Sequence, residues 1–426
     1  MPNLLMIESW VGASGLVLPE KIKKMGHRYT FVTRNPEHYR NWATEAGLFS
    51  GKENAEHPAI ALADKVIVIE TNEKETLLPE LVRLHRQERF SGVLSCCDYY
   101  LDAVAEAAEA LDLPGAPPAS VEVARQKHLM REACLRAGLP SPAFLATGSL
   151  EEARRFADRI GYPLVVKAVD LCAGEEVSCV YSQTELDQAF RSIANHPLNI
   201  RGQKRPSEVL IEEYLEGEEF SVETCTYGGV TAVIGITDKS LIGHPCFIES
   251  GVMHPAPLKN SERTLLSKFV CQALTAVGYT HGLTHTEVKL TKNGPRIVEI
   301  NVRMGGSYLF EVIERVTGVD FCEATVHLAL DRLPKVALQE TGIRSAALRF
   351  LLPPADGTIS AILGVDAVLR DPDIIRVAVN GVVGKKVRRP KDNNDFIGHI
   401  LAVDRVGPGA REKAESACRQ IQIVMS

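Results

Sequence analysis

Short apolar runs alternate with amphipathic or polar segments along the first part of the chain. Four of these runs have the length and composition of buried strands, at residues 4–7, 29–33, 65–69 and 92–96. Strands separated by such segments are typical of a parallel sheet. The pattern therefore predicts an N-terminal parallel α/β domain over residues 1–115.

Residues 113–118, Leu-Pro-Gly-Ala-Pro-Pro, interrupt this pattern and mark a domain boundary near residue 115. A helix is expected over residues 120–137, since Gly138 and Pro140 close it. Beyond it, helical and strand patterns are mixed, which predicts an α+β domain with an antiparallel sheet. The expected helices are one capped by Ser149 and Glu152 and ending at Gly161, and those at residues 185–194 and 261–277; the expected strands cover residues 164–168, 209–213, 220–227, 230–237, 284–289 and 296–300.

The last part of the chain, residues 341–426, has a mostly β pattern and is predicted to form an α+β module. Its expected strands cover residues 346–352, 357–363, 374–379 and 397–403, and a helix is expected near residues 410–422. A basic run at residues 385–389 is interpreted as a solvated turn rather than a nucleic-acid contact. Nothing in the residues of this module indicates chemistry.

Composition narrows the kinds of function that the chain can have. Hydrophobic residues make up 45% and charged residues 24% of the 426 residues, and the formal net charge is -6. This negative balance argues against a general affinity for nucleic acid, and no apolar run reaches the roughly 20 residues that span a bilayer. The ten cysteines include no CxxC pair, so we expect reduced thiols. A cytoplasmic protein that acts on small molecules is therefore expected.

Acidic and amide side chains recur at alternate positions on a predicted hairpin. Alternation places Glu299, Asn301 and Arg303 on one face, and the tight hairpin brings Glu287 beside them. Two carboxylates and an amide oxygen suit Mg²⁺, which fills its octahedron with nucleotide phosphates and water, and Mn²⁺ is the alternative metal. Arg303 cannot lose its proton and could stabilise a phosphoryl group or a carboxyl oxygen. Acids on a hairpin alone usually form a solvated face, but the spacing E-x11-E-x-N-x-R-x-G-G favours a metal site.

A strand end at residues 211–220, Ile-Glu-Glu-Tyr-Leu-Glu-Gly-Glu-Glu-Phe, has the features of an adenine pocket. A hinge after a strand offers backbone groups to the adenine edge and apolar side chains to its faces, and a following acid can bind ribose hydroxyls. Lys167 closes a buried strand, where an unpaired charge is costly unless it meets a phosphate. Lys127 lies on the predicted helix after the linker, where an exposed helical lysine is the equally open alternative.

These residues resemble the ATP-grasp superfamily and, within it, carboxylate–amine ligases similar to bacterial L-amino-acid ligases. The resemblance covers about residues 1–330 in architecture and 120–307 in motifs. It implies a biotin-carboxylase-like N-terminal α/β domain and an ATP-grasp domain at residues 116–340 with a lid subdomain at about 140–210. It also implies that the C-terminal module closes one side of the substrate cavity.

The resemblance assigns roles to particular residues by motif match. Lys127 and Lys167 would contact the ATP phosphates; Glu212, Tyr214 and Leu215, with Glu213 in the same strand end, would line the adenine, and Glu219 the ribose. Glu287, Glu299 and Asn301 would hold magnesium, and Arg303 would stabilise the acyl phosphate and the tetrahedral intermediate.

Two further segments are expected to bind substrate. Residues 248–257 are rich in turn formers, and a similar loop lines the substrate site of amino-acid ligases; the alternative is an ordinary connecting loop with a surface histidine. The second segment is expected to begin a helix whose N-terminal amides could bind a carboxylate. The candidate residues are Glu249, Ser250, Gly251 and His254 in the first segment and Gly305, Gly306 and Ser307 in the second.

Two features depart from the superfamily pattern. The loop at residues 169–176 contains one glycine and three acids, where the superfamily has a loop rich in glycine and serine that closes over the triphosphate. Whether this loop grips the phosphates or contacts substrate stays open. His285 stands where the D-alanine ligases place a basic residue, and it is expected to be a neutral, hydrogen-bonded strand residue.

The expected reaction is ATP-dependent ligation of a small-molecule carboxylate, such as an amino acid, to an amine. Three alternatives remain: a purine-pathway or biotin-carboxylase-type enzyme that uses bicarbonate or formate, a non-catalytic nucleotide-binding protein, and an NAD-linked reductase. The last is disfavoured because the turn at residues 12–15 lacks G-x-G-x-x-G. The oligomeric state is open, with a homodimer as one option.

Overall fold

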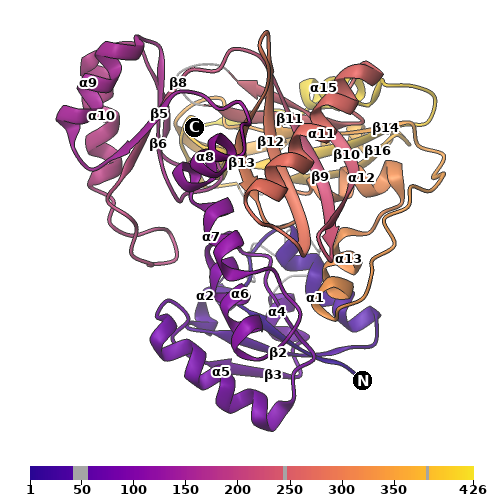
Figure 1. The fold of residues 1–426 in the computed structure, drawn as a ribbon. Helices are drawn as coiled ribbons and strands as arrows, with labels where there is room; N and C mark the ends of the chain where they lie inside the picture. The colour runs from indigo at the N-terminus through magenta and orange to yellow at the C-terminus, as the bar shows by residue number, and fades with distance from the viewer. Residues whose placement is uncertain (42–55, 243–246, 380–382) are drawn as a thin grey trace.

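A four-stranded parallel sheet forms the N-terminal domain, which lies at the bottom of Figure 1. A computed structural model describes residues 1–41, 56–242, 247–379 and 383–426. The strand order β3-β2-β1-β4 confirms the predicted parallel α/β sheet and places the carboxyl end of β1 inside the sheet rather than at its edge. The strands are β1 (Asn3–Ile7), β2 (Arg28–Thr33), β3 (Lys65–Val68) and β4 (Gly92–Leu94); the helices are α1 (Ser14–Lys24), α2 (Pro36–Asn41), α4 (Pro58–Ala61), α5 (Lys74–Glu88), the 3-10 helix η1 (Asp98–Tyr100) and α6 (Leu101–Ala110).

The linker leads into two short helices, α7 (Pro118–Arg125) and α8 (Lys127–Arg136), so the single helix expected over residues 120–137 is wrong. The break is Gln126, whose extended backbone has φ -85° and ψ 103°. At this break the amide of Lys127 donates a hydrogen bond to the carbonyl oxygen of Val169, at 2.9 Å. A tertiary contact therefore outweighs the local helical pattern and fixes the start of α8.

The lid subdomain is a small antiparallel sheet covered by two helices, at the upper left of Figure 1. Its strand order is β5-β8-β6-β7, and an apolar cluster beneath α9 and α10 fills the space between helices and sheet. Ser149 Oγ accepts from the amide of Glu152, which confirms the predicted start of α9. The elements are β5 (Phe144–Thr147), α9 (Leu150–Ile160), β6 (Leu164–Ala168), β7 (Val177–Val180), α10 (Gln183–Ala194) and β8 (Val209–Glu213).

An eight-stranded antiparallel sheet with strand order β13-β12-β9-β10-β11-β14-β18-β16 makes up the rest of the core. Separate apolar clusters cover its two faces. Its last three strands belong to the C-terminal region, so residues expected to form a separate module extend the same sheet. The strands are β9 (Glu218–Tyr227), β10 (Val230–Ile242), β11 (Ile248–His254), β12 (Gly282–Thr291), β13 (Gly294–Asn301), β14 (Ser345–Leu351), β16 (Ile374–Val379) and β18 (Gly398–Asp404); the helices are α11 (Asn260–Ala276), α12 (Leu309–Thr317), α13 (Phe321–Ala329) and α15 (Ala410–Gln420).

A three-stranded sheet completes the C-terminal region, in the order β17-β15-β19. Its elements are β15 (Gly357–Leu363), α14 (Val365–Val368), β17 (Lys386–Val387), the 3-10 turn η2 (Asn393–Asp395) and β19 (Gln422–Met425). None of the helices in the described residues combines the length and apolar character that crossing a bilayer requires.

Candidate active site

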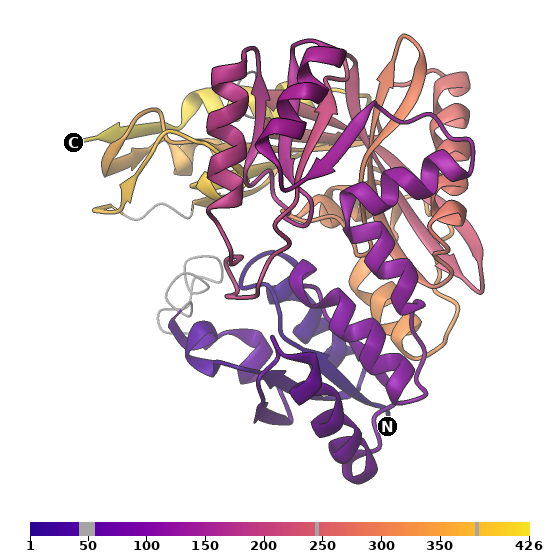
Figure 2. The same cartoon turned by 60° about the vertical axis from the view of Figure 1, so that its left-hand side comes forward.

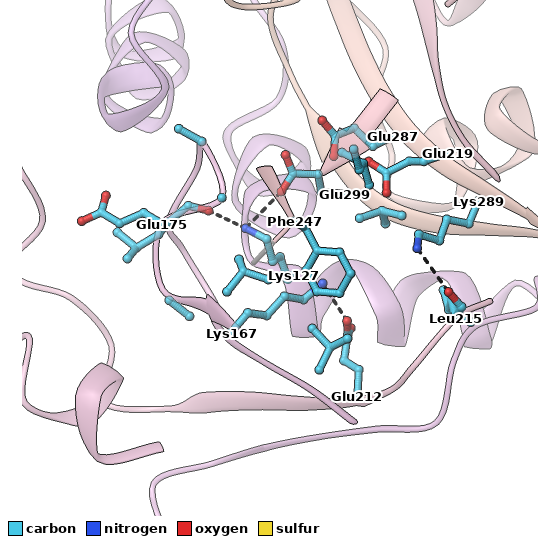
Figure 3. A pocket seen from close by; sticks show the side chains of 18 of the residues that line it. Lys127, Lys167, Glu175, Glu212, Leu215, Glu219, Phe247, Glu287, Lys289 and Glu299 are labelled. Atoms are coloured by element: carbon cyan, nitrogen blue, oxygen red, sulfur yellow. Dashed lines mark hydrogen bonds and ion pairs between the residues drawn. The ribbon is translucent and has the colours of Figure 1, made fainter. Parts of the chain in front are cut away.

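The lid subdomain and the eight-stranded sheet enclose a cleft of about 940 Å³ (Figure 3). Strands β6 and β8 supply one wall, and β9, β10, β12 and β13 supply the other. Apolar side chains with a few converging charged groups are typical of small-molecule sites. Lining residues include all seven that the sequence proposes for ATP, namely Lys127, Lys167, Glu212, Glu213, Tyr214, Leu215 and Glu219, together with Glu249, Glu287 and Glu299.

Lys127 and Lys167 are both buried at the cleft, so the alternative of an exposed helical Lys127 is wrong. Lys127 is 6% exposed; its Nζ donates to the carbonyl oxygen of Leu171 at 2.5 Å and lies 3.3 Å from Glu299 Oε2. Lys167 is 5% exposed, and its Nζ lies 2.6 Å from Glu212 Oε2 (Figure 3). Two buried cations therefore line the cleft.

Glu212 is held between two cations. Its Oε1 accepts from Arg131 Nε, and its Oε2 meets Lys167. Burial alone would raise the pKa of Glu212, but Arg131 and Lys167 lower it to about 2, so the carboxylate is ionised at neutral pH. Both carboxylate oxygens of Glu212 are therefore engaged by Arg131 and Lys167. The groups of this strand end that can bind a nucleotide base are those of its backbone.

An aromatic wall follows the hinge. The rings of Tyr214 and Phe247 are nearly parallel, with an interplanar angle of 23° and centroids 6.3 Å apart. Lys289 Nζ lies 5.4 Å from the centre of the Tyr214 ring and donates to the carbonyl oxygen of Leu215 at 3.2 Å. A flat base can stack on such rings. The sequence reasoning missed Phe247 and Lys289, because both reach the hinge from other parts of the chain.

The hairpin of β12 and β13 pairs its two acids directly. Glu287 is opposite Glu299 in the register, and His285 is opposite Asn301. Asn301 Nδ2 donates to Glu299 Oε1 at 2.8 Å, so its Oδ1 remains an acceptor for a ligand. The structure therefore brings the three proposed metal ligands together on adjacent strands.

Lys239, on β10, is a charged neighbour of this pair that the sequence reasoning missed. It forms ion pairs with Glu287, with Glu219 at 3.3 Å and with Glu249 at 3.8 Å. Burial alone would lower the pKa of Lys239, but these acids hold it well above its ordinary value. Strand alternation could have indicated Lys239 from the sequence, because Lys239 on β10 pairs in register with Glu219 on β9.

The expectation that His285 is neutral is wrong, although the histidine is a hydrogen-bonded strand residue. Its Nδ1 lies 2.6 Å from Glu223 Oε1 and its Nε2 3.2 Å from Glu287 Oε1. Burial alone would lower the pKa of His285, but these two carboxylates raise it to about 10. The charged ring of His285 therefore contacts Glu287, one of the proposed metal ligands.

The donor set fits a hard divalent cation such as Mg²⁺. Glu287, Glu299 and Asn301 offer only oxygen to a metal, and such a set binds magnesium together with phosphate oxygens and water. Within residues 1–41, 56–242, 247–379 and 383–426, no group of three or more His, Cys, Asp and Glu side chains could hold a metal by itself. The set therefore suits an ion that arrives with a nucleotide.

The glycine-poor loop at residues 169–176 is tied to its surroundings by hydrogen bonds. Lys127 binds the carbonyl oxygens of Val169 and Leu171, and the amide of Asn393 in η2 donates to the carbonyl oxygen of Ala173 at 3.1 Å. Ala173 has φ 58° and Gly174 has φ 70°, so the loop turns through left-handed backbone at the cleft. Contacts from α8 and from the C-terminal region thus fix the loop at residues 169–176. The corresponding loop of the superfamily is rich in glycine and serine.

Arg303 follows β13 and lines a neighbouring cavity, where Asp98 binds it and where Glu299, of the cleft lining, helps to raise its pKa. Its Nε donates to Asp98 Oδ2 at 2.7 Å and its Nη1 to the carbonyl oxygen of Met304 at 2.8 Å. The following helix, α12, begins at Leu309 rather than at Gly305, because Ser307 and Tyr308 adopt left-handed backbone with φ 50° and 65°. The predicted helix start at residues 305–307 is therefore wrong by several residues.

The segment expected to be a substrate loop is strand β11 inside the sheet, so the loop prediction is wrong. Pairing with β10 shifts register after Ser240, and beyond this irregularity Glu249 lines the cleft. Ser250 Oγ donates to the carbonyl oxygen of Ser240 and accepts from Arg349, and His254 is 3% exposed. A Cβ at Gly251 would lie 2.6 Å from the carbonyl oxygen of Leu348, so this glycine serves close strand packing.

Comparison with protein families gives three matches along the chain. Residues 20–115 match the ATP-grasp N-terminal domain, residues 160–311 match the ATP-grasp domain, and residues 349–426 match the L-amino acid ligase C-terminal domain 2. Fold and cleft together thus define an ATP-grasp fold. The chain carries an ATP-grasp domain preceded by its N-terminal domain and followed by the C-terminal domain 2 of the L-amino acid ligases.

Two curated relatives are ligases or synthases. Carnosine synthase 1 of Gallus gallus is 30% identical over 61% of this chain, which covers 31% of that protein. Alanine–anticapsin ligase of Bacillus subtilis is 26% identical over 59% of this chain and 56% of its own length. The chain thus spans about a third and about half of the length of these relatives.

Two solved structures share the fold along nearly the whole chain. The L-amino acid ligase from Bacillus licheniformis has a TM-score of 0.81 at 24% identity and matches 100% of this chain and 99% of its own. The biotin carboxylase domain of the 2-oxoglutarate carboxylase from Hydrogenobacter thermophilus, a complex with MgADP and bicarbonate, has a TM-score of 0.69 at 18% identity, over 99% of this chain and 90% of its own. The expected biotin-carboxylase-like architecture is confirmed.

Proposed function

We propose that this protein is an ADP-forming carboxylate–amine ligase that binds ATP with Mg²⁺ in the cleft. The observation that carries the proposal is the Glu287 and Glu299 pair, which faces Lys127 and Lys239. Paired acids in contact with lysines at the lining of one cleft suit a metal–triphosphate, because the carboxylates would hold the metal and the ammonium groups would bind the phosphates.

The cleft residues divide between the parts of the nucleotide. Tyr214 and Phe247 stack on the base, the strand end at residues 212–215 meets its edge with backbone groups, and Glu219 binds the ribose. Lys127 and Lys167 bind the phosphates, and the Glu212 carboxylate orients the Lys167 ammonium and opposes the lowering of its pKa by burial. Glu287, Glu299 and Asn301 would hold the Mg²⁺ ion, which when bound would neutralise negative charge on the triphosphate.

The reaction has two steps that need no covalent change in the protein. A substrate carboxylate oxygen attacks the γ-phosphorus, and the bond between that phosphorus and the bridging oxygen of ADP breaks. The amine then attacks the carbonyl carbon of the acyl phosphate, and phosphate leaves with the former carboxylate oxygen while the amine loses a proton. Arg303, a permanent cation, stabilises the negative oxygen of the tetrahedral intermediate.

Amino acids or similar compounds are the proposed substrates. The C-terminal domain match and the names of the relatives, carnosine synthase and alanine–anticapsin ligase, support this substrate class. Glu249 is the proposed substrate contact on β11, because it alone among the candidates on that strand lines the cleft.

The proposal is tested by ADP release from ATP and Mg²⁺ with single amino acids, pairs of amino acids, and bicarbonate. We expect release with amino-acid pairs, abolished in Glu299→Gln and kept in Glu122→Gln, which changes an exposed acid on α7. Release with bicarbonate alone would favour the carboxylase-type alternative. No release with any substrate would contradict the enzyme proposal.

A further inference from the structure

The side chain that holds Arg303 comes from a different domain. Asp98 lies in η1, directly after β4 of the N-terminal sheet, whereas Arg303 follows the last strand of the metal hairpin. The two side chains are 8% and 14% exposed, and their ion pair spans 205 positions of the chain. The proposed catalytic arginine therefore depends on a carboxylate that lies outside the ATP-grasp domain match.

Asp98 is itself held in place from the N-terminal side. The Oδ2 atom that accepts from Arg303 also accepts from Trp10 Nε1 at 2.9 Å. Trp10 packs edge-on against Tyr99, with ring centroids 5.8 Å apart. The amide of Cys97 donates to Ser95 Oγ at 3.1 Å, which shapes the turn before η1. A carboxylate can orient another side chain only if it is itself held in place, and these contacts hold Asp98.

The contacts of Arg303 leave one nitrogen for a ligand. Nε binds Asp98 and Nη1 binds the carbonyl oxygen of Met304, and in the described parts of the chain no hydrogen bond engages Nη2. Because the guanidinium is planar, two fixed nitrogens set the direction of the third. Burial alone would raise the pKa of Asp98, but Arg303 lowers it, so the pair is charged at neutral pH.

We propose that Asp98 is a positioning residue, which acts through its hydrogen bond to Arg303 Nε and aims Nη2 at the oxygen that becomes negative during ligation. Through Asp98 and Trp10, the N-terminal domain contributes to the chemical step. The inference rests on the role of Arg303 in the proposed function.

The test is Asp98→Asn, which keeps the shape of the side chain and an acceptor for Trp10 but removes the charge. We expect kcat to fall by about 10- to 100-fold, as for groups that orient a side chain in contact with the reacting atoms. KM and Kd for ATP should change less than about twofold, since Asp98 is not part of the cleft lining. The matched control is Glu106→Gln on α6, which removes an ion-paired carboxylate that contacts Lys74 and not Arg303.

A double-mutant cycle separates this inference from the proposed function. In an Arg303→Lys background, Asp98→Asn should add little further loss, because its effect passes through the arginine. Additive losses, or a kcat of Asp98→Asn within twofold of the parent, would overturn the positioning role and leave the ligase proposal intact. Full turnover by Arg303→Lys would instead contradict the role of Arg303 in the proposed function.

A milder variant tests the positioning role of Asp98 if Asp98→Asn does not fold. Trp10→Phe removes one hydrogen-bond donor to Asp98 and keeps an aromatic ring against Tyr99. We expect a several-fold lower kcat with an unchanged Kd for ATP. An unchanged kcat in this variant would overturn the inference.

Discussion

Arg201 and Glu8 form a buried ion pair that joins the lid subdomain to the N-terminal domain. Arg201 lies in the loop after α10, which descends to the N-terminal sheet in Figure 2, and its Nη2 lies 3.1 Å from Glu8 Oε2. Glu8, at the carboxyl end of β1, also accepts from Thr33, Thr71 and the amide of Arg34. The side chains are 7% and 1% exposed, so the lid has a fixed anchor on the N-terminal domain.

Arg201→Met should release this anchor. Removing one partner of a buried pair leaves an uncompensated charge and costs about 3–5 kcal/mol. We expect faster hydrogen exchange at the amides of residues 198–204, measured by mass spectrometry. The control is Arg155→Met, which breaks an exposed pair with Glu151 on α9 and should cost less than about 1 kcal/mol. Equal exchange in both variants would contradict an anchoring role.

Glu212 should stabilise the fold in a pH-dependent way. Its folded pKa of about 2 lies below the ordinary 4.5, so its contribution is present above pH 4.5 and is lost as pH falls through about 2. Glu212→Gln should therefore cost about 3 kcal/mol at neutral pH, and less as the solution becomes more acidic. Denaturation from pH 7 to pH 3 checks this, with exposed Glu151→Gln as the control. A cost that stays constant down to pH 3 would contradict the assignment.

Phe247→Ala should weaken ATP binding by about tenfold. Loss of a ring that stacks on a base typically costs about 1–3 kcal/mol. Titration with ATP and Mg²⁺ measures the Kd, and kcat at saturating ATP should stay within twofold because an apolar ring offers no ligand to the metal or to the phosphates. An unchanged Kd would remove Phe247 from the proposed base site.

The residues of β11 should separate into a functional and a structural group. Glu249→Gln should lower kcat/KM at least tenfold, because Glu249 pairs with Lys239 at the cleft.

His254→Gln should lower the free energy of unfolding by about 1–3 kcal/mol and leave kcat/KM within twofold. The reason is that His254 is buried, and its Nδ1 is hydrogen-bonded to Thr237 Oγ1. A Cβ at Gly235 would lie 2.4 Å from His254, so Gly235→Ala should be destabilising too. Thermal unfolding with steady-state kinetics distinguishes the two groups.

Local periodicity in the sequence was enough to place the hairpin residues. Alternation along β12 and β13 with a tight turn puts Glu287 opposite Glu299, because both the pleat and the turn are properties of nearby residues. The same reasoning predicted most strands of the lid and of the eight-stranded sheet. Their boundaries differ from the predicted ones by a few residues.

Residues that depend on packing between distant segments could not be predicted in this way. Asp98 and Arg303 are brought together by the meeting of two domains, and Phe247, which directly precedes β11, stacks near Tyr214 after β8. Gln126 breaks a helical pattern because Lys127 bonds to the loop at Val169. In each case the deciding partner lies far along the chain, where local patterns carry no signal.

Transfer of a carboxylate oxygen to inorganic phosphate is the signature of an acyl phosphate formed in this cleft. The protein is incubated with ATP, Mg²⁺ and a pair of amino acids labelled with ¹⁸O in their carboxylates, and the products are analysed by mass spectrometry. We expect an amide product, ADP, and inorganic phosphate that carries one ¹⁸O, all absent in Glu299→Gln. An amide formed without label in the phosphate, or ADP release that survives Glu299→Gln, would contradict this expectation.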